Sequence, residues 1–297
     1  MKRCFILILI IGCFFDISGQ TLTPEVISSS GGYFESTNAS VSWTLGETVT
    51  ETFTGTSFIL TQGFQQPLGI QITGIDLDLL VFLEGPYNGL EMKTGLNSKG
   101  MIPLNQPYNQ PPWEYPGTEY LAAIPNSDVV DWILIELRDA PDAVSAVTST
   151  RIARQAALLL RDGSIVGTDG STMLEFNNAF TQQLYVIVWH RNHLGIMTAN
   201  GVTATNGIYE YDFSIAASQV HGGSDGHKDI GAGVWGMTAG DANQDNLVDI
   251  SDKTQWVAFA GQVGYLSSDL NLDGEVNNPD KNESWQTNTN KSSHVPE

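Results

Sequence analysis

The C-terminal part of the chain contains one acidic pattern twice. The first copy, DANQDNLVDISD, runs from Asp241 to Asp252, and the second, DLNLDGEVNNPD, runs from Asp269 to Asp280. Each copy places a side-chain oxygen at positions 1, 3, 5, 9 and 12 of a twelve-residue loop. Calcium is a hard cation that takes about six to eight oxygen ligands, and a loop of this length wraps them around the ion. The pattern therefore predicts a C-terminal module ordered by metal.

We predict two calcium ions, one in each loop. The side chains expected to coordinate the first ion are Asp241, Asn243, Asp245, Asp249 and Asp252. Those expected to coordinate the second ion are Asp269, Asn271, Asp273, Asn277 and Asp280. Position 7 of each loop would add a backbone carbonyl, from Leu247 and Glu275.

The remaining positions of the loops fit the same geometry. Position 6 must turn sharply, which Gly274 does freely, and Asn246 is among the residues that tolerate left-handed geometry. Position 8, Val248 or Val276, is expected to be an apolar plug that faces the partner loop. The alternative interpretation is a pair of acidic, solvated turns without metal.

Position 12 is Asp in both loops, where the usual EF-hand has a bidentate Glu. With Asn or Asp at positions 3 and 9, GDANQDNLVDISD and DLNLDGEVNNPD resemble type I dockerin repeats. The resemblance covers residues 239–290 and implies two calcium ions, a helix after each loop and a pseudo-twofold relation between the halves. It also implies a protein partner, because dockerins dock onto cohesin domains and so attach enzymes to scaffolds or cell surfaces.

The chain opens with the features of a secretory signal. Lys2 and Arg3 precede an apolar run from Phe5 to Phe15, which is too short for a permanent membrane anchor. We expect a signal peptide over residues 1–19 and a secreted or cell-surface protein without membrane insertion. The segment 10–13 also fits a lipoprotein box loosely, which is the alternative.

Both cysteines, Cys4 and Cys13, lie inside the predicted signal. An exported chain without disulfides needs another source of stability, and calcium is the evident substitute. The formal net charge of −20 disfavours nucleic acid and anionic lipid as partners.

The middle of the chain predicts β structure. Residues 20–67 form a hairpin-rich N-terminal segment, in which TVTETF and SFILTQGF flank the turn 54–56. This segment looks like a short β element that recurs in secreted, surface-associated bacterial proteins. Residues 70–238 are expected to form an antiparallel β-sandwich, and residues 239–297 a small α-helical calcium-binding module. The fold class is therefore mainly β.

Several strands of the sandwich are expected from runs rich in β-branched and aromatic residues: LDLLVFLEG, VVDWILIELRD, LYVIVWHRNH and IYEYDFSI. Asp162-Gly163 predicts a hairpin between ALLLR and SIVG. TSTRIARQAALLL favours a strand, with a helix as the alternative. No βαβ rhythm is present. Residues 102–125 hold many prolines and predict an extended loop.

We predict no catalytic residues. Residues 222–226 match G-x-S-x-G, but the glycine-rich stretch that follows argues against the helix that a nucleophile elbow requires. His190 and His193 form H-x-x-H, which on a strand would point the two rings to opposite faces, so structural histidines are favoured over zinc ligands. Scattered carboxylates cannot be paired from sequence: Asp131, Glu136, Glu175 and Glu210.

The pattern as a whole favours an exported, non-catalytic calcium-binding protein whose dockerin-like tail attaches the β-sandwich to a cohesin-like or other surface protein. One alternative is a dockerin-bearing, polysaccharide-active hydrolase. Another is an adhesin that binds glycan through aromatic residues of the Pro-rich loop, although these are favoured to pin the loop instead: Tyr108, Trp113, Tyr115 and Tyr120.

Overall fold

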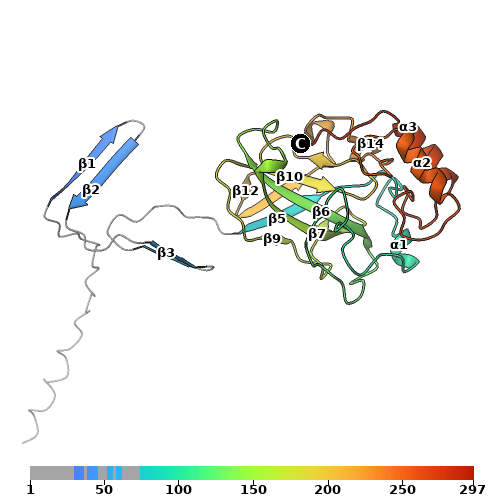
Figure 1. Cartoon of the computed structure of the whole chain (residues 1–297), viewed down its shortest axis with the longest axis horizontal. Coiled ribbons are helices and arrows are strands. Elements are labelled where there is room, and N and C mark those ends of the chain that lie inside the picture. Colours follow the sequence, from blue (N-terminus) through green and yellow to red (C-terminus); the bar gives the residue numbers. More distant parts are fainter. Residues whose placement is uncertain (1–29, 37–38, 46–51, 56–57, 62–73) are drawn as a thin grey trace, which may run out of the picture. The chain divides into compact units, whose positions relative to one another are not determined.

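The computed structural model describes residues 30–36, 39–45, 52–55, 58–61 and 74–297 (Figure 1). The chain divides into two compact units, Met1–Ile70 and Gln71–Glu297. The predicted signal peptide, residues 1–19, lies outside the described residues. No helix in the described part of the chain is long and apolar enough to cross a membrane.

The described residues of the N-terminal unit form two antiparallel strand pairs. β1 (Ser30–Ser36) pairs with β2 (Ala39–Leu45), and β3 (Thr52–Gly55) pairs with β4 (Phe58–Thr61). The second pair corresponds to the predicted hairpin, but Thr54 and Gly55, which were expected in its turn, belong to β3.

Two sheets form the centre of the second unit, which is mainly β. The five-stranded sheet has the order β11-β10-β6-β7-β8, and the four-stranded sheet has the order β12-β13-β5-β9. The first contains β6 (Val129–Ala140), β7 (Arg151–Leu160), β8 (Ile165–Val166), β10 (Gln183–Trp189) and β11 (Ile196–Met197). The second contains β5 (Ile75–Leu80), β9 (Leu174–Phe176), β12 (Ala204–Thr205) and β13 (Ile208–Asp212). A separate pair joins β14 (His227–Gly231) to β15 (Val234–Met237).

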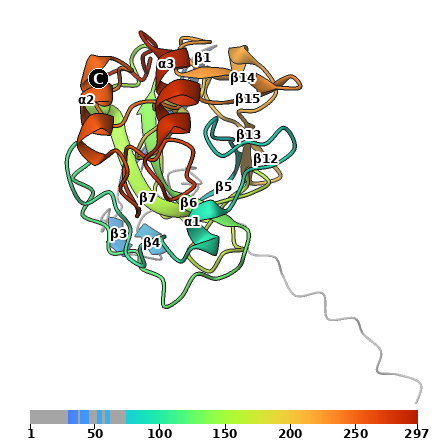
Figure 2. The ribbon, with the colours of Figure 1, turned by 90° about the vertical axis from the view of Figure 1, so that its right-hand side faces the viewer.

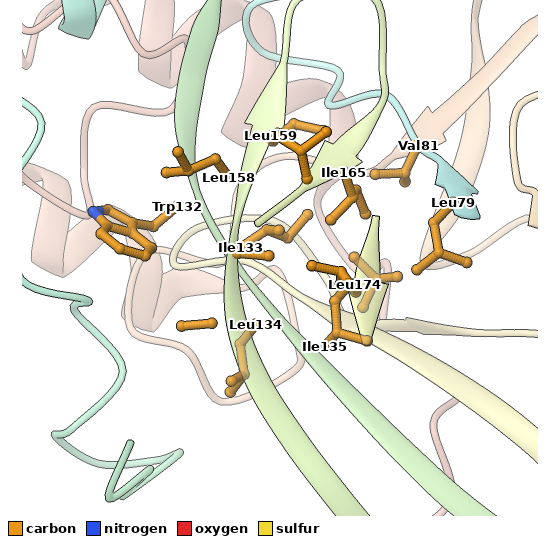
Figure 3. Close-up of a cluster of buried hydrophobic side chains, with 14 of the residues drawn as sticks. Leu79, Val81, Trp132, Ile133, Leu134, Ile135, Leu158, Leu159, Ile165 and Leu174 are labelled. Carbon is orange, nitrogen blue, oxygen red and sulfur yellow. The ribbon is translucent and has the colours of Figure 1, made fainter. Parts of the chain in front are cut away.

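The two sheets pack on one hydrophobic core, as in a β-sandwich. Leu79 and Leu174 of the four-stranded sheet lie in the same buried cluster as Ile133 and Ile135 of β6 and Leu159 of β7 (Figure 3). Pairing is antiparallel within both sheets except between β5 and β13, which run parallel. The expectation of purely antiparallel pairing is therefore wrong for this pair, whose strands are joined by a long connection instead of a hairpin.

β6 is buried on both faces, which explains its nearly continuous apolar sequence. One face packs on the core. The segment 102–125 covers the other: the Tyr108 hydroxyl donates to the carbonyl of Trp132 at 2.9 Å, and the Trp132 indole N–H donates to the carbonyl of Pro103 at 2.8 Å. The Pro-rich segment is therefore a loop pinned to the sheet by its aromatic residues.

β7 settles the ambiguity of TSTRIARQAALLL in favour of a strand. It pairs along its length with β6 and continues through a turn at Asp162-Gly163 into β8. The predicted hairpin at this turn is confirmed. The helix propensity of the segment does not decide its structure, because both of its faces contribute to packing within a sheet.

α2 and α3 lie near each other at one end of the unit (Figures 1 and 2). α2 spans Ile250–Phe259, and a π-helical segment, Asp280–Trp285, continues into α3, Gln286–Asn288. The short α1, Gly95–Ser98, precedes the Pro-rich loop. Two 3₁₀ turns, Thr148–Thr150 and Ala217–Gln219, are the remaining helical segments among residues 74–297. The predicted boundary between residues 238 and 239 lies inside the compact unit Gln71–Glu297.

Replacement of Ile133 by Ala tests the shared core. The Ile133 side chain is fully buried between the sheets, so Ile133→Ala should lower the free energy of unfolding by about 2–5 kcal/mol, measured by urea denaturation. Leu90→Ala is the matched control, because Leu90 is 83% exposed. The control should change stability by about 0.5 kcal/mol or less. Equal effects of the two substitutions would contradict the packing described.

Candidate metal centre

The two acidic loops occupy equivalent places in the chain. The first, residues 241–252, follows β15 and leads into α2, and the second, residues 269–280, leads into the π-helical segment. The carboxylates at positions 1 and 12 are buried in both loops, whereas position 5 is more accessible. A buried carboxylate needs hydrogen bonds or a compensating charge.

The carboxylate at position 1 organises each loop from inside. Asp241 accepts hydrogen bonds from the backbone N–H groups at positions 5 and 6, at 3.0 and 3.2 Å. Asp269 accepts from the same two positions of its own loop, at 3.1 and 2.8 Å. The two loops therefore curl around their first residue in the same way.

Position 12 closes each loop by a second matching set of bonds. Asp252 accepts from the N–H groups at positions 3 and 9, at 3.1 and 2.7 Å. Asp280 accepts from positions 3 and 9 of the second loop, at 3.1 and 2.8 Å. Asp252 also completes a capping box with Asp249 at the start of α2. The short Asp at position 12 thus joins the end of the loop to the helix that follows.

Positions 3 and 5 are also linked in the same way. In the first loop, the Asn243 amide donates to the Asp245 carboxylate at 2.7 Å, and in the second the Asn271 amide donates to Asp273 at 3.3 Å. Each Asn therefore directs its amide nitrogen towards position 5, and its amide oxygen accepts from the position 5 N–H.

The backbone adopts left-handed geometry at positions 4 and 6 of both loops. The φ angles are 66° and 70° at Gln244 and Asn246, and 57° and 86° at Leu272 and Gly274. The turn at position 6 is as the sequence predicts. The turn at position 4 was not anticipated, because neither Gln nor Leu marks a left-handed residue in a sequence.

Three further oxygens of the predicted ligand sets have no donor in the described part of the chain. The Asn277 side-chain oxygen, at position 9 of the second loop, is buried and has no hydrogen-bond partner in the described part of the chain. Within the same residues, the position 7 carbonyls of Leu247 and Glu275 accept no backbone hydrogen bond. A buried oxygen without a donor is costly unless something else satisfies it, and a cation does so.

The electrostatics of the loops favour an added positive charge. Burial, together with the neighbouring carboxylates Asp252 and Asp245, raises the pKa of Asp241 to about 8. Burial also raises the pKa of Asp269 to about 7, although Arg191 opposes the change. Like charges held together away from water favour the protonated form unless a cation compensates them.

Carboxylates alone do not make a metal site here. Among residues 74–297, no group of three or more His, Cys, Asp or Glu side chains is arranged to hold an ion. Each loop combines its carboxylates with Asn oxygens and a backbone carbonyl. That mixed oxygen set fits calcium, which accepts all three kinds of ligand.

The two halves are related crosswise through their tryptophans. The Trp256 indole of α2 donates to the carbonyl of Asn277 in the second loop at 2.9 Å, and the Trp285 indole donates to the carbonyl of Asp249 in the first. The residue after each loop stacks on the opposite tryptophan: Lys281 lies 5.0 Å from the Trp256 ring centroid, and Lys253 lies 5.4 Å from that of Trp285.

The two tryptophans occupy positions in their repeats that differ by one residue. Trp285 lies one residue farther from its loop than Trp256 does. The segment before it is π-helical, Asp280–Trp285. A π turn accommodates one extra residue, so both indoles reach equivalent carbonyls.

Position 8 of each loop is buried, and its backbone pairs with a segment that follows a helix. Val248 exchanges backbone hydrogen bonds with residues 290–291, which follow α3, and Val276 does so with residues 261–262, which follow α2. Each loop is therefore bound by backbone pairing to the segment after the helix of the other half.

The turn His190–His193 fastens the second loop to the five-stranded sheet. The Asn192 amide donates to the carbonyl of Asp269 at 2.6 Å, and the Arg191 guanidinium donates to the carbonyl of Leu266. In return, the Gln244 amide of the first loop donates to the carbonyl of Arg191 at 2.9 Å. Sequence reasoning missed this role, because it depends on contacts between residues far apart in the chain.

A buried ion pair sits beneath this turn. Arg191 Nε donates to Asp131 Oδ2 at 2.9 Å, and the Tyr265 hydroxyl donates to Asp131 Oδ1 at 2.7 Å. The Arg191 guanidinium also lies over the Tyr265 ring, 4.2 Å from its centroid. Burial opposes ionisation of Asp131, but Arg191 and the hydrogen bonds from His190 and Tyr265 outweigh it and hold the pKa at about 2.

The two histidines of H-x-x-H face each other because the chain leaves the strand at Trp189. Their Nδ1 atoms are 3.1 Å apart, so the expectation of opposite faces is wrong. His193 Nε2 accepts from the N–H of Gly85 at 3.2 Å, and His190 Nε2 lies 3.3 Å from Asp131. Burial lowers the pKa of both imidazoles. These bonds fit neutral, structural histidines, the favoured interpretation.

Two glycines let the second loop approach the sandwich. A Cβ at Gly85 would lie 1.9 Å from the carbonyl oxygen of Leu270, and one at Gly95 would lie 2.7 Å from that of Leu272. A side chain at either position would displace the loop. A third connection comes from Glu84, which accepts from Lys228 at 2.7 Å and from the Asn288 amide at 2.6 Å.

The other candidate residues are not brought together as a catalytic site. After Ser224 the chain enters the strand β14 and not a helix, so the nucleophile elbow is not formed. Asp131 pairs with Arg191, and Glu136 with Arg138. Glu175 and Glu210 are exposed, on β9 and β13.

No family model matches the chain. No curated protein matches it. A chain from the crystal structure of a type II cohesin–X–dockerin complex of Acetivibrio cellulolyticus, an N-terminal interface mutant, is similar with a TM-score of 0.32 and 19% identity. That similarity covers 54% of this chain and 82% of the other.

Asp131→Asn tests the buried pair. It leaves Arg191 buried without its counter-charge and should lower the free energy of unfolding by about 3–5 kcal/mol at pH 7. Because the pKa of Asp131 is depressed in the folded state, its contribution is present above the unfolded value of 3.8 and is lost as the pH falls towards about 2.

The stability difference between wild type and variant should therefore narrow over that acidic range in denaturation series at successive pH values. Asp76→Asn, at an exposed position of β5, is the control and should show no comparable loss. A constant difference down to pH 2.5 would contradict the account.

Proposed function

We propose that the chain is an exported, non-catalytic calcium-binding protein that docks its β-sandwich unit onto a protein partner at a cell surface. The observation that carries the proposal is the hydrogen-bond scheme shared by the two loops, position by position, around oxygens at the places where calcium ligands are expected. The resemblance to type I dockerin repeats and the signal-like N-terminus support docking and export.

Calcium in each loop would be held by the side chains at positions 1, 3, 5, 9 and 12 and the carbonyl at position 7. The bound ion would supply the positive charge that the buried carboxylates Asp241 and Asp269 otherwise lack. The donor-free oxygen of Asn277 supports this assignment for the second loop. The role of the ion is architectural: it orders loops that would otherwise repel themselves.

Calcium would also strengthen the attachment of the loops to the sandwich. The second loop packs on Gly85 and Gly95 and receives the hydrogen bond from Asn192. Ordering of this loop by calcium should therefore stabilise the sheet beneath it, because both belong to one compact unit.

The surface available for docking is on α2. Ile250 and Val257 are 65% and 60% exposed, and they lie two helical turns apart on the same face. Val263, just beyond the helix, is 63% exposed. Exposed apolar residues gathered on one helix face are typical of a protein-binding surface.

Calcium binding is tested by removing one ligand from each loop. Wild type should bind two calcium ions in isothermal titration calorimetry, Asp245→Ala and Asp273→Ala one each, and the double variant none. At free calcium about a hundred times the dissociation constant, each site should add about 2.7 kcal/mol of stability.

Thermal melts in calcium and in chelator measure the same linkage. Wild type should melt at a higher temperature in calcium, and the double variant at the same temperature in both. Glu283→Gln, at an exposed acidic residue outside the loops, is the control and should behave as wild type. A wild-type melting temperature indifferent to calcium would contradict the proposal.

Docking is tested with the chain from residue 20 onward as bait for secreted and envelope proteins, in calcium and again in chelator. The bait should retain a partner protein in calcium but not in chelator. The Val257→Asp substitution should abolish this retention without altering calcium binding. Leu90→Asp, on an exposed loop of the sandwich, is the matched surface control. Retention that is unaffected by Val257→Asp would exclude α2 as the docking face.

A further inference from the structure

A cavity of about 250 Å³ opens on the face of the five-stranded sheet away from the core. Its lining includes Trp113 of the Pro-rich segment and five residues of the sheet, Glu136, Arg138, Arg151, Arg154 and Trp189. Glu136 and Arg138 alternate along β6 with Ile135 and Leu137, which face the sandwich core. The charged residues therefore share the outer face of the sheet. The first acidic loop and residues 296–297 line the opposite side.

The sheet side of this cavity carries an excess of positive charge. The Glu136 carboxylate forms ion pairs with two arginines, at 2.7 Å from Arg138 Nε and 3.6 Å from Arg151 Nη1. Arg154 has no acidic partner in the described part of the chain. Because the chain has 13 basic and 33 acidic residues, three arginines at one cavity do not follow from its composition.

Arg154 is held in place by neutral contacts. Its Nη1 donates to the carbonyl of Trp113 at 2.6 Å, and its guanidinium lies over the Tyr115 ring, 5.2 Å from the centroid. Burial and the nearby charge of Arg151 lower the pKa of Arg154. Neighbouring guanidinium groups repel each other, and a bound anion would relieve that repulsion. The other acidic residues of the lining are Asp241, which is turned into its own loop, and Glu297.

Two indoles form fixed walls. The Trp189 ring lies so close to Gly195 that a Cβ there would meet a ring carbon at 2.2 Å. The Trp189 N–H is buried and has no acceptor among residues 74–297. Trp113 packs edge-on against Tyr108, with ring centroids 4.9 Å apart. The cavity thus offers flat apolar walls beside the arginines.

We propose that this cavity binds a uronic-acid unit of an acidic saccharide. Arg151 and Arg154 would hold the carboxylate, and the indoles of Trp113 and Trp189 would pack against the sugar ring. Pockets for larger organic ligands occupy about 300–1,000 Å³, so a smaller cavity suits a single ring. An acidic peptide side chain would use the arginines but would leave the aromatic walls without a role.

Binding is tested by titrating the chain from residue 20 onward, with calcium held constant, with trigalacturonic acid and with its methyl ester. The ester keeps the rings and removes the charge. The acid should bind, and the ester should bind about tenfold more weakly or worse, because a hydrogen bond to a charged group contributes about 1.5–3 kcal/mol. An acetylated tri-glutamate peptide serves as a probe with carboxylates but no ring.

Three variants locate the site. Arg151→Gln, at a half-exposed side chain, and Arg154→Gln should each weaken binding of the acid by about tenfold, and Trp113→Ala should weaken both sugar ligands. Arg161→Gln is the matched control, because Arg161 pairs with Glu91 and Asp128 away from the cavity. Far-ultraviolet circular dichroism verifies that each variant is folded.

Several results would overturn the proposal. The first is that the acid does not bind at millimolar concentration, and the second is that the acid and the ester bind with equal affinity. The third is that Arg151→Gln and Arg161→Gln weaken binding equally, and the fourth is that the peptide binds as tightly as the sugar. Calcium binding by the two loops is unaffected by any of these outcomes, so this proposal and the proposed function fail separately.

Discussion

The buried pair of Asp131 and Arg191 is the contact on which the second unit depends. Asp131 lies in the middle strand of the larger sheet, and Arg191 lies in the turn that carries Asn192 to the second acidic loop. Desolvation of two charges is expensive, and the pair tolerates it because Tyr265 and His190 supply further hydrogen bonds. The orientation of this turn determines where the second loop packs.

This arrangement makes the acidic loops part of the sandwich rather than an appendage. Backbone carbonyls of the second loop lie close to Gly85 and Gly95. The first loop is hydrogen-bonded through Gln244 to the turn that contains Arg191. Order in the loops and order in the sheet are therefore coupled through direct contacts. A cation that organises the loops would act on the whole unit, which has no disulfide to stabilise it.

The sequence was sufficient for features that depend on local pattern. The oxygen spacing predicted loops whose hydrogen bonds repeat from one copy to the other, and β-branched runs predicted β6, β10 and β13. The spacing could not reveal the crosswise contacts of Trp256 and Trp285, because a π turn shifts the second tryptophan by one residue. Nor could it reveal the turn His190–His193, whose partners lie far away in the chain.

Other expectations failed for a related reason. The parallel pairing of β5 with β13 and the convergence of His190 and His193 are both decided by tertiary packing and not by residue spacing. Likewise, Arg151 and Arg154 look like ordinary exposed charges in a strand, and they share a cavity with Glu136 and Arg138 only because β7 pairs with β6 through a bulge. Clusters of this kind become visible only in three dimensions.

The most direct test of the account is a crystal structure of the chain grown in calcium. The account predicts one ion in each loop, about 2.3–2.6 Å from its oxygens, with Leu247 and Glu275 contributing their carbonyls and Asn277 its side-chain oxygen. The turn His190–His193 should remain bonded to the second loop. Loops without ions at millimolar calcium, or ions bound at other surface carboxylates, would contradict it.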